Sequence, residues 1–480
     1  MPSIPALALS KIPDPLFKLG KALALAGGEC YIVGGWVRDA FLDNPGKDID
    51  LEVHGIEAPL LEKVLWQFGK PHFIGKSFGV YHLELSGILY DIALPRQEQK
   101  IGHGHKGFTT QTHPYLGFSQ AALRRDFTMN AMGIRIPSLE LVDPYGGLGD
   151  LEKKILRHVS PAFSEDPLRA LRAMQMLARF ECTLAPETLD LCAQQPLEEL
   201  PPERLWEEWK KLLLKAKQPS KGLEYLKQTQ LLRYFPELER LCGTQQDPLW
   251  HPEGDVWVHT LMVLDAAAEI RDKEISSSQA DSDYEKLVLM LGALCHDFGK
   301  PQTTKFEDGR WRSPGHEPLG EKPTRNFLKR FTKEVRLHED VVALVRDHLK
   351  PALLFKERDR LSDAGIRRLS LRVDIPRLVR VAKADHFGRT TPDALAREFP
   401  EGEWLLNRAA QLGVRDSKPL PFLQGRHLLQ IGQKPGPHIG SLLDRCFELQ
   451  LEGKILSLEA ALTWVKQEIE KPSALPNSLG

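Results

Sequence analysis

The spacing of apolar residues divides the chain at about residue 161. Before this point, residues 29–33 form a short apolar run, and residues 48–53 alternate charged and apolar positions with the period of a half-buried strand. Residues 82–85 and 88–94 flank Ser86-Gly87 and predict a β-hairpin. A helix is expected over residues 36–42, so the first third predicts a sheet with helices.

Beyond residue 161 the apolar residues recur with helical spacing. The helices that this spacing predicts cover residues 167–180, 186–194, 203–216 and 458–470, with a second helical block over 255–385. Residues 249–252 are a plausible linker, and polar or Gly/Pro-rich loops are expected at 275–283 and 303–322. Residues 97–117 are rich in Gly, His, Lys and Thr and predict a mobile loop.

Net charge, cysteine content and the length of apolar runs limit the class of protein to which the chain can belong. The 480 residues carry a formal net charge of −1, so a nucleic-acid partner would have to meet local basic patches. Six scattered cysteines argue against disulfides or a thiolate zinc site and suit a reducing cytosol. We find neither a signal peptide nor a run of about 20 apolar residues, and therefore expect a cytoplasmic protein without a membrane span.

Two aspartates stand two positions apart on a predicted strand. The strand period points the Asp48 and Asp50 carboxylates to one face, where they suit Mg²⁺ bound together with substrate phosphates. Asp91, on the following hairpin, is a third candidate by sheet neighbourhood. Two such ions activate an attacking hydroxyl and neutralise a leaving pyrophosphate. A bare D-x-D pattern is also common on the solvent face of an amphipathic strand.

The segment upstream favours the metal interpretation. Gly34 and Gly35, between strand and helix, let the backbone approach a phosphate, and the start of the helix favours its negative charge. Arg38, one turn into the helix, adds a charge-assisted contact. The glycine pair alone would be a weak signal.

The glycines and aspartates belong to a longer series of motifs. They stand in GGWVRD (34–39) and KDIDLEV (47–53), which are followed by RRDFTMN (124–130), DPYGGLGDLEKKILRHV (143–159), EDPLR (165–169) and PPERLW (201–206). In this order and spacing the series resembles the class II tRNA nucleotidyltransferases, the CCA-adding enzyme family, over about residues 28–240.

This resemblance implies roles for the matching residues. Asp48, Asp50 and Asp91 would be the catalytic carboxylates. The nucleotide-binding residues would be Gly34, Gly35, Arg38, Arg124, Arg125, Asp126, Asn130, Asp166, Arg169 and Arg172. Among them, Arg124 and Arg125 would meet the triphosphate and sugar, while Asp166 and Arg169 would read the Watson–Crick edge of CTP or ATP. Alternatively, Asp166 only caps a helix that begins at Pro167, and the arginines are solvated.

The second helical block contains a set of histidines and aspartates. His259 lies on a predicted helix (256–270), and His296-Asp297 ends another (286–297), with Asp385 further on. This set resembles the HD phosphohydrolase superfamily. Imidazole and carboxylate together suit Ni²⁺, Mn²⁺ or Zn²⁺, which would activate a water for phosphoester hydrolysis. His316 and His348 are further candidate ligands.

The two resemblances together imply an α+β fold in four parts. These are a polymerase-β-like nucleotidyltransferase head with a mixed sheet (1–160), an all-α neck and body (161–248), an all-α HD domain (249–400) and a helical tail (401–480). CCA-adding enzymes with a fused HD domain form a bacterial branch, and similar members hydrolyse 2′,3′-cyclic phosphates and 2′-nucleotides. The HD domain can instead serve as a helical tail that grips tRNA.

Near the C-terminus, residues 425–440 read GRHLLQIGQKPGPHIG. Two helices around this Gly/Pro turn would present amides to a phosphate, or the turn is purely structural. Basic side chains in this half of the chain would meet the tRNA acceptor stem, or are simply solvated: Arg367, Arg368, Arg372, Arg377 and Lys434.

Several functions remain open at this point. The favoured one is addition of CCA to the tRNA 3′ end from CTP and ATP. Enzymes that add only CC or only A, and bacterial poly(A) polymerases, share the head motifs. A metal phosphohydrolase with a non-catalytic N-terminal half, or a non-catalytic RNA-binding module, requires Asp48 and Asp50 to be dispensable. The sequence does not indicate an oligomeric state.

Overall fold

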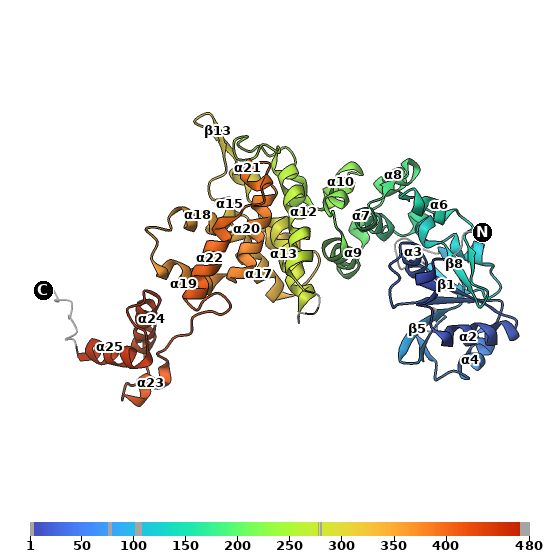
Figure 1. Cartoon of the computed structure of the whole chain (residues 1–480), viewed down its shortest axis with the longest axis horizontal. Helices are drawn as coiled ribbons and strands as arrows, with labels where there is room; N and C mark the ends of the chain where they lie inside the picture. Colours follow the sequence, from blue (N-terminus) through green and yellow to red (C-terminus); the bar gives the residue numbers. More distant parts are fainter. Residues whose placement is uncertain (1–3, 75–78, 101–107, 277, 279–280, 471–480) are drawn as a thin grey trace. The chain divides into compact units, whose positions relative to one another are not determined.

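The computed structural model describes residues 4–74, 79–100, 108–276, 278 and 281–470. The chain divides into two units, Met1–Phe235 and Pro236–Gly480 (Figure 1). The first unit contains the sheet and the second is built mainly of helices. The finer boundaries at residues 160, 248 and 400 remain predictions.

A mixed sheet forms the centre of the first unit, as predicted. Its strands are β1 Glu29–Val33, β2 Asp50–His54, β3 His72–Ile74, β4 Val80–Leu85, β5 Ile88–Ala93, β8 Gly133–Ile136 and β9 Glu140–Val142. They lie in the order β3-β4-β5-β2-β1-β8-β9. β1 is antiparallel to β2 and β8, whereas β2 is parallel to β5. The short, apolar β1 is an interior strand between β2 and β8, and its residues from Cys30 onward are buried.

The predicted hairpin is β4–β5. Ser86 and Gly87 both have positive φ, +51° and +80°, and two such residues match the twist of the paired strands. The sequence pattern therefore located this turn correctly.

Helices cover the sheet and then continue beyond it. The α-helices of the first unit are α1 Ala6–Leu9, α2 Asp14–Leu25, α3 Gly35–Phe41, α4 Ala58–Leu65, α5 Phe118–Ala122, α6 Gly147–Glu152, α7 Leu168–Phe180, α8 Pro186–Ala193, α9 Pro202–Lys215 and α10 Ser220–Gln228. Its 3₁₀ turns are η1 Thr128–Asn130, η2 Pro161–Glu165, η3 Leu197–Glu199 and η4 Leu231–Tyr234. α2 packs on β1 and β8, and α7 packs on α9 and α10. The apolar stripe of α7 is buried, and Trp209 of α9 is packed edge-on against Phe235.

The prediction of a loop over residues 97–117 was wrong in part. β6 Arg96–Lys100 and β7 Phe108–Thr112 pair as an antiparallel ribbon, with Gln97 opposite Gln111. The threonines of β7 favour a strand, a preference that the overall Gly, His and Lys content obscured. Residues 101–107 lie outside the described part of the chain.

The second unit is built on four helices that pack together: α12 Val256–Glu274, α13 Ser282–Cys295, α17 Val335–Asp347 and α20 Ile375–Phe387. The other helices are α11 Pro236–Glu239, α14 Lys300–Thr303, α15 His316–Leu319, α16 Glu321–Lys329, α18 Lys350–Lys356, α19 Asp363–Arg372, α21 Pro392–Leu395 and α22 Pro400–Gln411. α12 and α13 are apolar nearly all round because neighbouring helices cover them on several sides.

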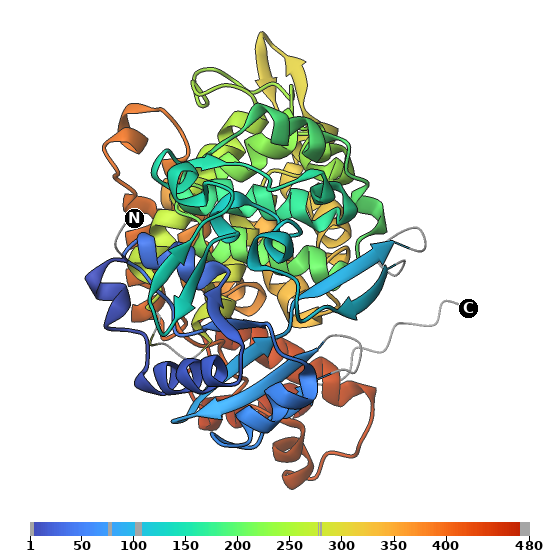
Figure 2. The same cartoon turned by 90° about the vertical axis from the view of Figure 1, so that its right-hand side faces the viewer.

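The predicted loop over residues 303–322 was also wrong in part. β12 Lys305–Glu307 and β13 Arg310–Arg312 form a hairpin, which stands out as two yellow arrows in Figure 2. Its turn is Asp308-Gly309, with φ of +50° and +74°. An Asp-Gly dipeptide between short strands is a recognised hairpin signal, so the sequence contained the information.

The last three helices have an apolar core of their own. α23 Gly425–Gln430 and α24 Pro437–Leu451 flank the Gly/Pro turn as predicted, and α25 Leu458–Glu470 follows. Their buried residues pack into one cluster: Leu423, Leu428, Cys446, Ile455, Ala461 and Val465. This segment is held together by contacts within itself.

Gly147, the first residue of α6, allows a close approach to η1. A Cβ atom at this position would lie 2.2 Å from the Thr128 carbonyl oxygen and 2.7 Å from its carbon, and backbone cannot easily move away. Gly147→Ala should therefore destabilise the first unit by roughly 1–3 kcal/mol, the usual cost of overpacking, and lower its thermal unfolding midpoint. Gly149→Ala in the same helix is the control, because its Cβ would meet no atom within 4 Å. An equal midpoint for the two variants would contradict the close-contact argument.

Candidate functional site

The turn between β1 and α3 brings backbone close to the first carboxylate. Gly34 has φ +75° and ψ −142°, a conformation essentially confined to glycine. A Cβ atom on Gly34 would lie 3.6 Å from Asp50 Oδ2. The glycine thus keeps the space beside this carboxylate open.

Asp50 and Asp91 lie on neighbouring parallel strands and are paired in register. Burial raises the pKa of Asp50, and the charge of Asp91 and, to a smaller extent, that of Asp48 raise it further, while Arg125 opposes them. This electrostatic repulsion is what a bound divalent cation relieves. The three carboxylates therefore fit a cation site at the start of β2.

The strand assignment of Asp48 was wrong by two residues. β2 begins at Asp50, and Asp48 is exposed just before it. The strand starts there because its partner β1 ends at Val33, opposite Asp50, where the Gly34 turn begins. Asp48 therefore stands at the end of a strand and not in its alternation.

His82 joins this site without having been predicted from the sequence. His82 of β4 lies opposite Asp91 of β5, and its Nε2 is 2.9 Å from Asp91 Oδ1. Both side chains are partly exposed. Only the hairpin register brings them together, and the spacing of residues along the sequence does not reveal it.

Asp126 connects α7 to the loop before β8. Its Oδ1 accepts hydrogen bonds from the Phe127 amide (2.8 Å) and Asn130 Nδ2 (3.0 Å), and its Oδ2 accepts one from Arg172 Nε (2.6 Å). Burial opposes ionisation of Asp126, but Arg172 and the hydrogen bonds outweigh it and lower its pKa. Asn130 Oδ1 in turn accepts a 2.7 Å bond from Arg38. A continuous polar chain therefore joins α7 to α3.

The two neighbouring arginines point in different directions. Arg125 donates to the Asn130 carbonyl (3.0 Å) and to Glu52 (3.2 Å), and it faces the Asp50 end of the site. Arg124 forms an ion pair with Glu165. Of this pair, Arg125 is the one placed beside the carboxylates.

Asp166 and Arg169 lie at the start of α7. Asp166 Oδ1 accepts the Leu168 amide (3.0 Å), so the helix-capping contact exists, while its Oδ2 accepts from Arg204 Nη2 (2.8 Å). Arg169 donates to the carbonyl oxygens of Ala162 and Arg124, both at 2.6 Å. A guanidinium has five N–H groups, so Arg169 retains donors for a ligand.

One cavity of about 490 Å³ collects most of these residues. The predicted site residues that line it are Gly34, Gly35, Arg38, Asp50, Arg125, Asp126, Asn130, Asp166, Arg169 and Arg172. Asp48, Asp91 and Arg124 are not among the lining residues. Arg96 and Arg204 line it without having been predicted, although Arg204 stands within the PPERLW motif. The cavity walls therefore carry six arginines suited to a polyanion, together with the carboxylates of Asp50, Asp126 and Asp166.

A second cluster lies in the other unit, where α12, α13 and α20 meet. His259, His296 and Asp385 offer ligand atoms within 4.8 Å of one another. His259 Nε2 is 3.1 Å from Asp385 Oδ1 and 3.4 Å from His296 Nε2. Asp297 Oδ2 is 3.1 Å from His296 Nε2. The four predicted ligands are thus brought together.

The two further candidates join the cluster through Asp297. His316 Nε2 is 3.4 Å from both His348 Nε2 and Asp297 Oδ1. Asp297, His316 and His348 form a second group whose ligand atoms lie within 4.8 Å. Asp297 contacts both groups, and the rings of His296 and His348 also lie edge to face, with their centroids 5.3 Å apart.

The donor atoms in this cluster suit a metal ion. The Nδ1 atoms of His296, His316 and His348 are 2.7–2.8 Å from backbone carbonyl oxygens, which leaves each Nε2 facing the cluster. Burial and the neighbouring histidines lower the pKa of His348 to about 3, which keeps its ring neutral. The two buried oxygens of Asp297 face the cluster: Oδ2 is 2.7 Å from Lys300 Nζ, and Oδ1 is 3.4 Å from His316 Nε2. Neutral imidazoles and buried carboxylate oxygens form the donor set of a borderline transition metal.

This cluster opens into a cavity of about 450 Å³. Asp297, His316, His348 and Asp385 line its polar end, together with Lys300 and Arg389. Trp250, Trp311 and two leucines form an apolar wall. The cavity therefore combines metal-ligand atoms, cationic groups and flat apolar surface, as an organic phosphoester requires.

Three segments of the chain match known families. Residues 30–157 match the poly A polymerase head domain, residues 183–242 match the probable RNA and SrmB-binding site of polymerase A, and residues 256–390 match the HD domain. The two candidate sites thus fall in separate families.

Similarity to whole proteins decides the family. A multifunctional CCA protein of Xylella fastidiosa (strain 9a5c) is 35% identical over 420 residues, which is 84% of this chain and 94% of that protein. The chain belongs to the multifunctional CCA protein family. Another member, from Stenotrophomonas maltophilia, is 36% identical over 432 residues, with 86% and 96% coverage.

Solved structures agree with the fold expected for a multifunctional CCA protein. A CCA-adding enzyme in its apo form II matches with a TM-score of 0.63 and 22% identity over 97% of this chain and 99% of that one. The Thermotoga maritima CCA-adding enzyme complexed with tRNA matches with a TM-score of 0.59 and 21% identity over 98% and 99%. The resemblance of the motifs to this family and the α+β fold are both confirmed.

Proposed function

We propose that this protein adds C, C and A to the 3′ end of tRNA, using CTP and ATP. One observation supports this most strongly: the glycine turn, the Asp50 carboxylate and the α7 arginines line a single cavity in a member of the multifunctional CCA protein family. In this reaction the tRNA 3′-oxygen bonds to the α-phosphorus of the nucleotide, and pyrophosphate leaves.

The carboxylates in and near this cavity and the basic side chains of its wall would have different roles. Asp48, Asp50 and Asp91 would hold Mg²⁺, which lowers the pKa of the attacking hydroxyl and neutralises the leaving pyrophosphate. The Gly34-Gly35 turn and Arg125 bind the triphosphate and align it with the RNA end. Asp126 holds Arg172 and Asn130 in place, so it orients the site without accepting a proton.

The direct test measures products at single-nucleotide resolution. A tRNA transcript that ends at the discriminator base is incubated with Mg²⁺ and CTP, ATP or both. Addition of C-C-A establishes the activity. Arrest at CC, extension only of a CC-ended tRNA, or a long A tail would identify instead a restricted enzyme or a poly(A) polymerase, and absence of extension would contradict the proposal.

Asp166 and Arg169 would select the base in place of a nucleic-acid template. A carboxylate accepts from an exocyclic amine, and a guanidinium donates in a planar fork. Arg169→Ala should reduce the preference for CTP and ATP over UTP and GTP by roughly 10–100-fold, because a lost base contact removes discrimination. Competition between nucleotides in the extension assay measures this preference.

Arg179→Ala is the matched control for this prediction. Arg179 lies further along α7, donates to Gln175 and does not line the cavity. It should leave nucleotide preference unchanged. Unchanged preference in Arg169→Ala as well would mean that base selection resides elsewhere.

The HD cluster supports a second activity. We infer that His259, His296, Asp297 and Asp385, together with His316 and His348, hold Ni²⁺, Mn²⁺ or Zn²⁺ and hydrolyse 2′,3′-cyclic phosphates or 2′-nucleotides. The metal would supply a hydroxide at neutral pH. Lys300 and Arg389 would bind the phosphate. Retention of tRNA binding without hydrolysis would instead identify the domain as a helical tail that grips RNA.

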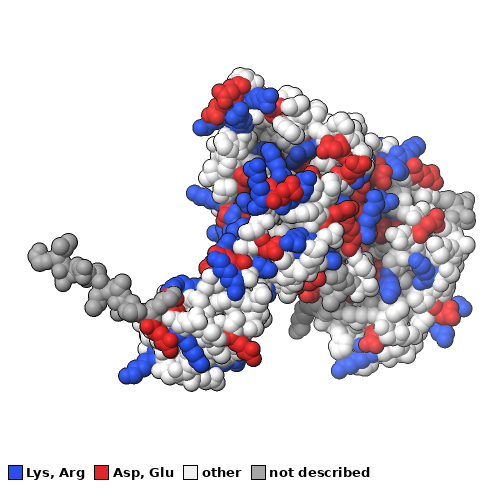
Figure 3. Space-filling view, turned by 60° about the vertical axis from the view of Figure 1, so that its left-hand side comes forward, with Lys and Arg blue, Asp and Glu red and all other residues white. Residues whose placement is uncertain are grey.

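The surface charge is compatible with an RNA partner that binds at local basic patches. Lys and Arg mix with Asp and Glu over the face in Figure 3, in keeping with the net charge of −1. Within the described ranges, no helix has the length and apolar character of a membrane span. We propose that the protein works in the cytoplasm, where its tRNA and nucleotide substrates are found.

A further inference from the structure

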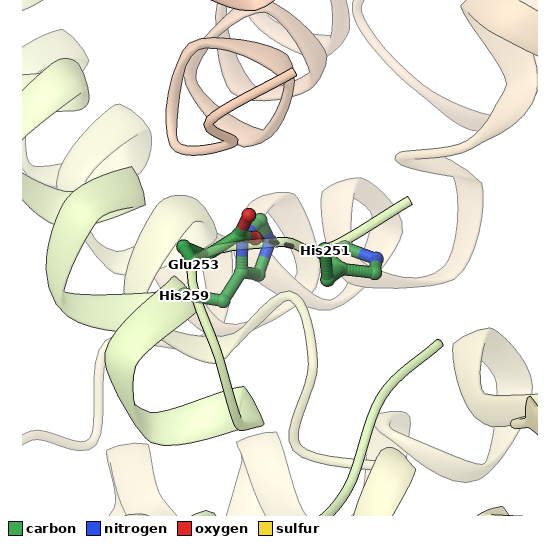
Figure 4. Close-up of side chains that lie close together, drawn as sticks. All are labelled: His251, Glu253 and His259. Atoms are coloured by element: carbon green, nitrogen blue, oxygen red, sulfur yellow. Dashed lines mark hydrogen bonds and ion pairs between the residues drawn. The ribbon is translucent and has the colours of Figure 1, made fainter. Parts of the chain in front are cut away.

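Glu253 is a buried carboxylate beside the HD cluster that is not part of the ligand set. It lies in the segment before α12, and its side chain is 1% exposed. Figure 4 shows its side chain close to those of His259 and His251. Its Oε1 is 2.8 Å from His259 Nδ1 and 2.9 Å from His251 Nδ1.

These contacts determine which nitrogen of His259 faces the cluster. A carboxylate oxygen only accepts hydrogen bonds, so the contact with Glu253 places a proton on His259 Nδ1. This leaves Nε2, which faces Asp385 Oδ1 and His296 Nε2, as the ring nitrogen that can meet a metal ion. His251 and His259 both lie at hydrogen-bond distance from Glu253 Oε1, which indicates an N–H group on each imidazole ring. We therefore do not place a metal ion between these three side chains.

His259 differs in this respect from the other histidines of the cluster. The Nδ1 atoms of His296, His316 and His348 face carbonyl oxygens, whereas His259 faces a carboxylate. A carboxylate partner increases the basicity of an imidazole and strengthens its bond to a metal. Among the histidines of the cluster, Glu253 therefore acts directly on His259.

The second oxygen of Glu253 reaches the other side of the cluster. Its Oε2 accepts the Thr390 amide at 3.2 Å. Thr390 directly follows Arg389, which donates to both oxygens of Asp385. One carboxylate therefore connects α12, which carries His259, to the end of α20, which carries Asp385.

We propose that Glu253 is a positioning residue of the HD site, which fixes the ring of His259 and the spacing between α12 and α20. This proposal rests on the metal-dependent function proposed above. Glu253 contacts neither substrate nor metal; it acts through His259 and Asp385.

The test is Mn²⁺ titration of the full-length protein. Glu253→Ala should weaken Mn²⁺ binding by about 10–100-fold, the usual effect of losing the partner of a ligating histidine. Glu253→Gln keeps the size and one acceptor and should lose less. Glu237→Gln is the control: Glu237 is also a buried carboxylate of this unit, with its side chain 8% exposed, but it pairs with Arg330.

A second measurement, made on the metal-free protein, distinguishes a loss of positioning from misfolding of the variant. With ¹⁵N-labelled histidine, the Nδ1–H signal of His259 should be present in the metal-free parent and in Glu237→Gln, and should shift or vanish in Glu253→Gln. Parent-like Mn²⁺ affinity and an unchanged His259 signal in the Glu253 variants would overturn the positioning role alone. If the parent protein takes up no Mn²⁺, the metal site itself is wrong and the positioning role falls with it.

Discussion

Replacing Asp50 by alanine should lower the rate of nucleotide addition to tRNA by at least about 10³-fold. Asp50 is the carboxylate that both lines the N-terminal cavity and lies in register with Asp91. Its loss removes a ligand from a cation that contributes several kcal/mol to the transition state, and each ~1.4 kcal/mol corresponds to a factor of ten. Extension of a tRNA transcript under single-turnover conditions measures this rate.

The same variant should bind tRNA as the parent protein does, because RNA binding relies on other parts of the chain. Asp190→Ala is the control, since Asp190 is an exposed carboxylate on α8 that does not line the cavity. A rate within tenfold of the parent in Asp50→Ala would refute the role of this carboxylate in metal binding. It would also favour the rival class in which the N-terminal half is not catalytic.

Replacing His296 by alanine should remove phosphoester hydrolysis by the HD domain, again by about 10³-fold or more. His296 lies in the cluster with its Nε2 3.4 Å from that of His259 and 3.1 Å from Asp297. CCA addition should stay within twofold of the parent. Release of phosphate from a 2′-nucleotide, measured beside tRNA extension in the same preparation, gives both rates.

His338→Ala is the matched control for this variant. His338 is a buried histidine on α17 that belongs to neither ligand group, so hydrolysis should persist when it is replaced. Persisting hydrolysis in His296→Ala would rule out the proposed metal site. A parallel loss of CCA addition would show that the two activities are not independent.

Local sequence patterns were sufficient to predict the first strand, the glycine turn and the hairpin of the N-terminal unit. The apolar run of β1, the glycine pair after it and the Ser86-Gly87 turn each act through neighbours in the chain, and the structure places them as expected. These features are predictable because a few adjacent residues determine them. The candidate histidine and aspartate ligands were instead predicted from their order along the chain, a His-Asp pair with a histidine before it and an aspartate after it, which resembles the HD superfamily.

Contacts between distant segments could not be predicted in the same way. Arg204 reaches Asp166 across 38 positions, and Glu253 reaches Thr390 across 137. Neither residue differs in type from a solvated surface charge, so its role depends on how helices pack. The β6–β7 ribbon was missed for a related reason, since a strand is stabilised by a partner that the local composition does not reveal.

The separate core of α23–α25 has a consequence for how this chain can change over generations. Its buried residues all lie between Leu423 and Val465, whereas the proposed metal ligands all precede residue 390. Such a segment can change its own packing over generations as long as its contacts with α19 persist, where Arg367 donates to the Leu451 carbonyl oxygen and Arg368 pairs with Glu448. We therefore expect the core of α23–α25 to tolerate substitutions that the buried histidine and aspartate cluster would not.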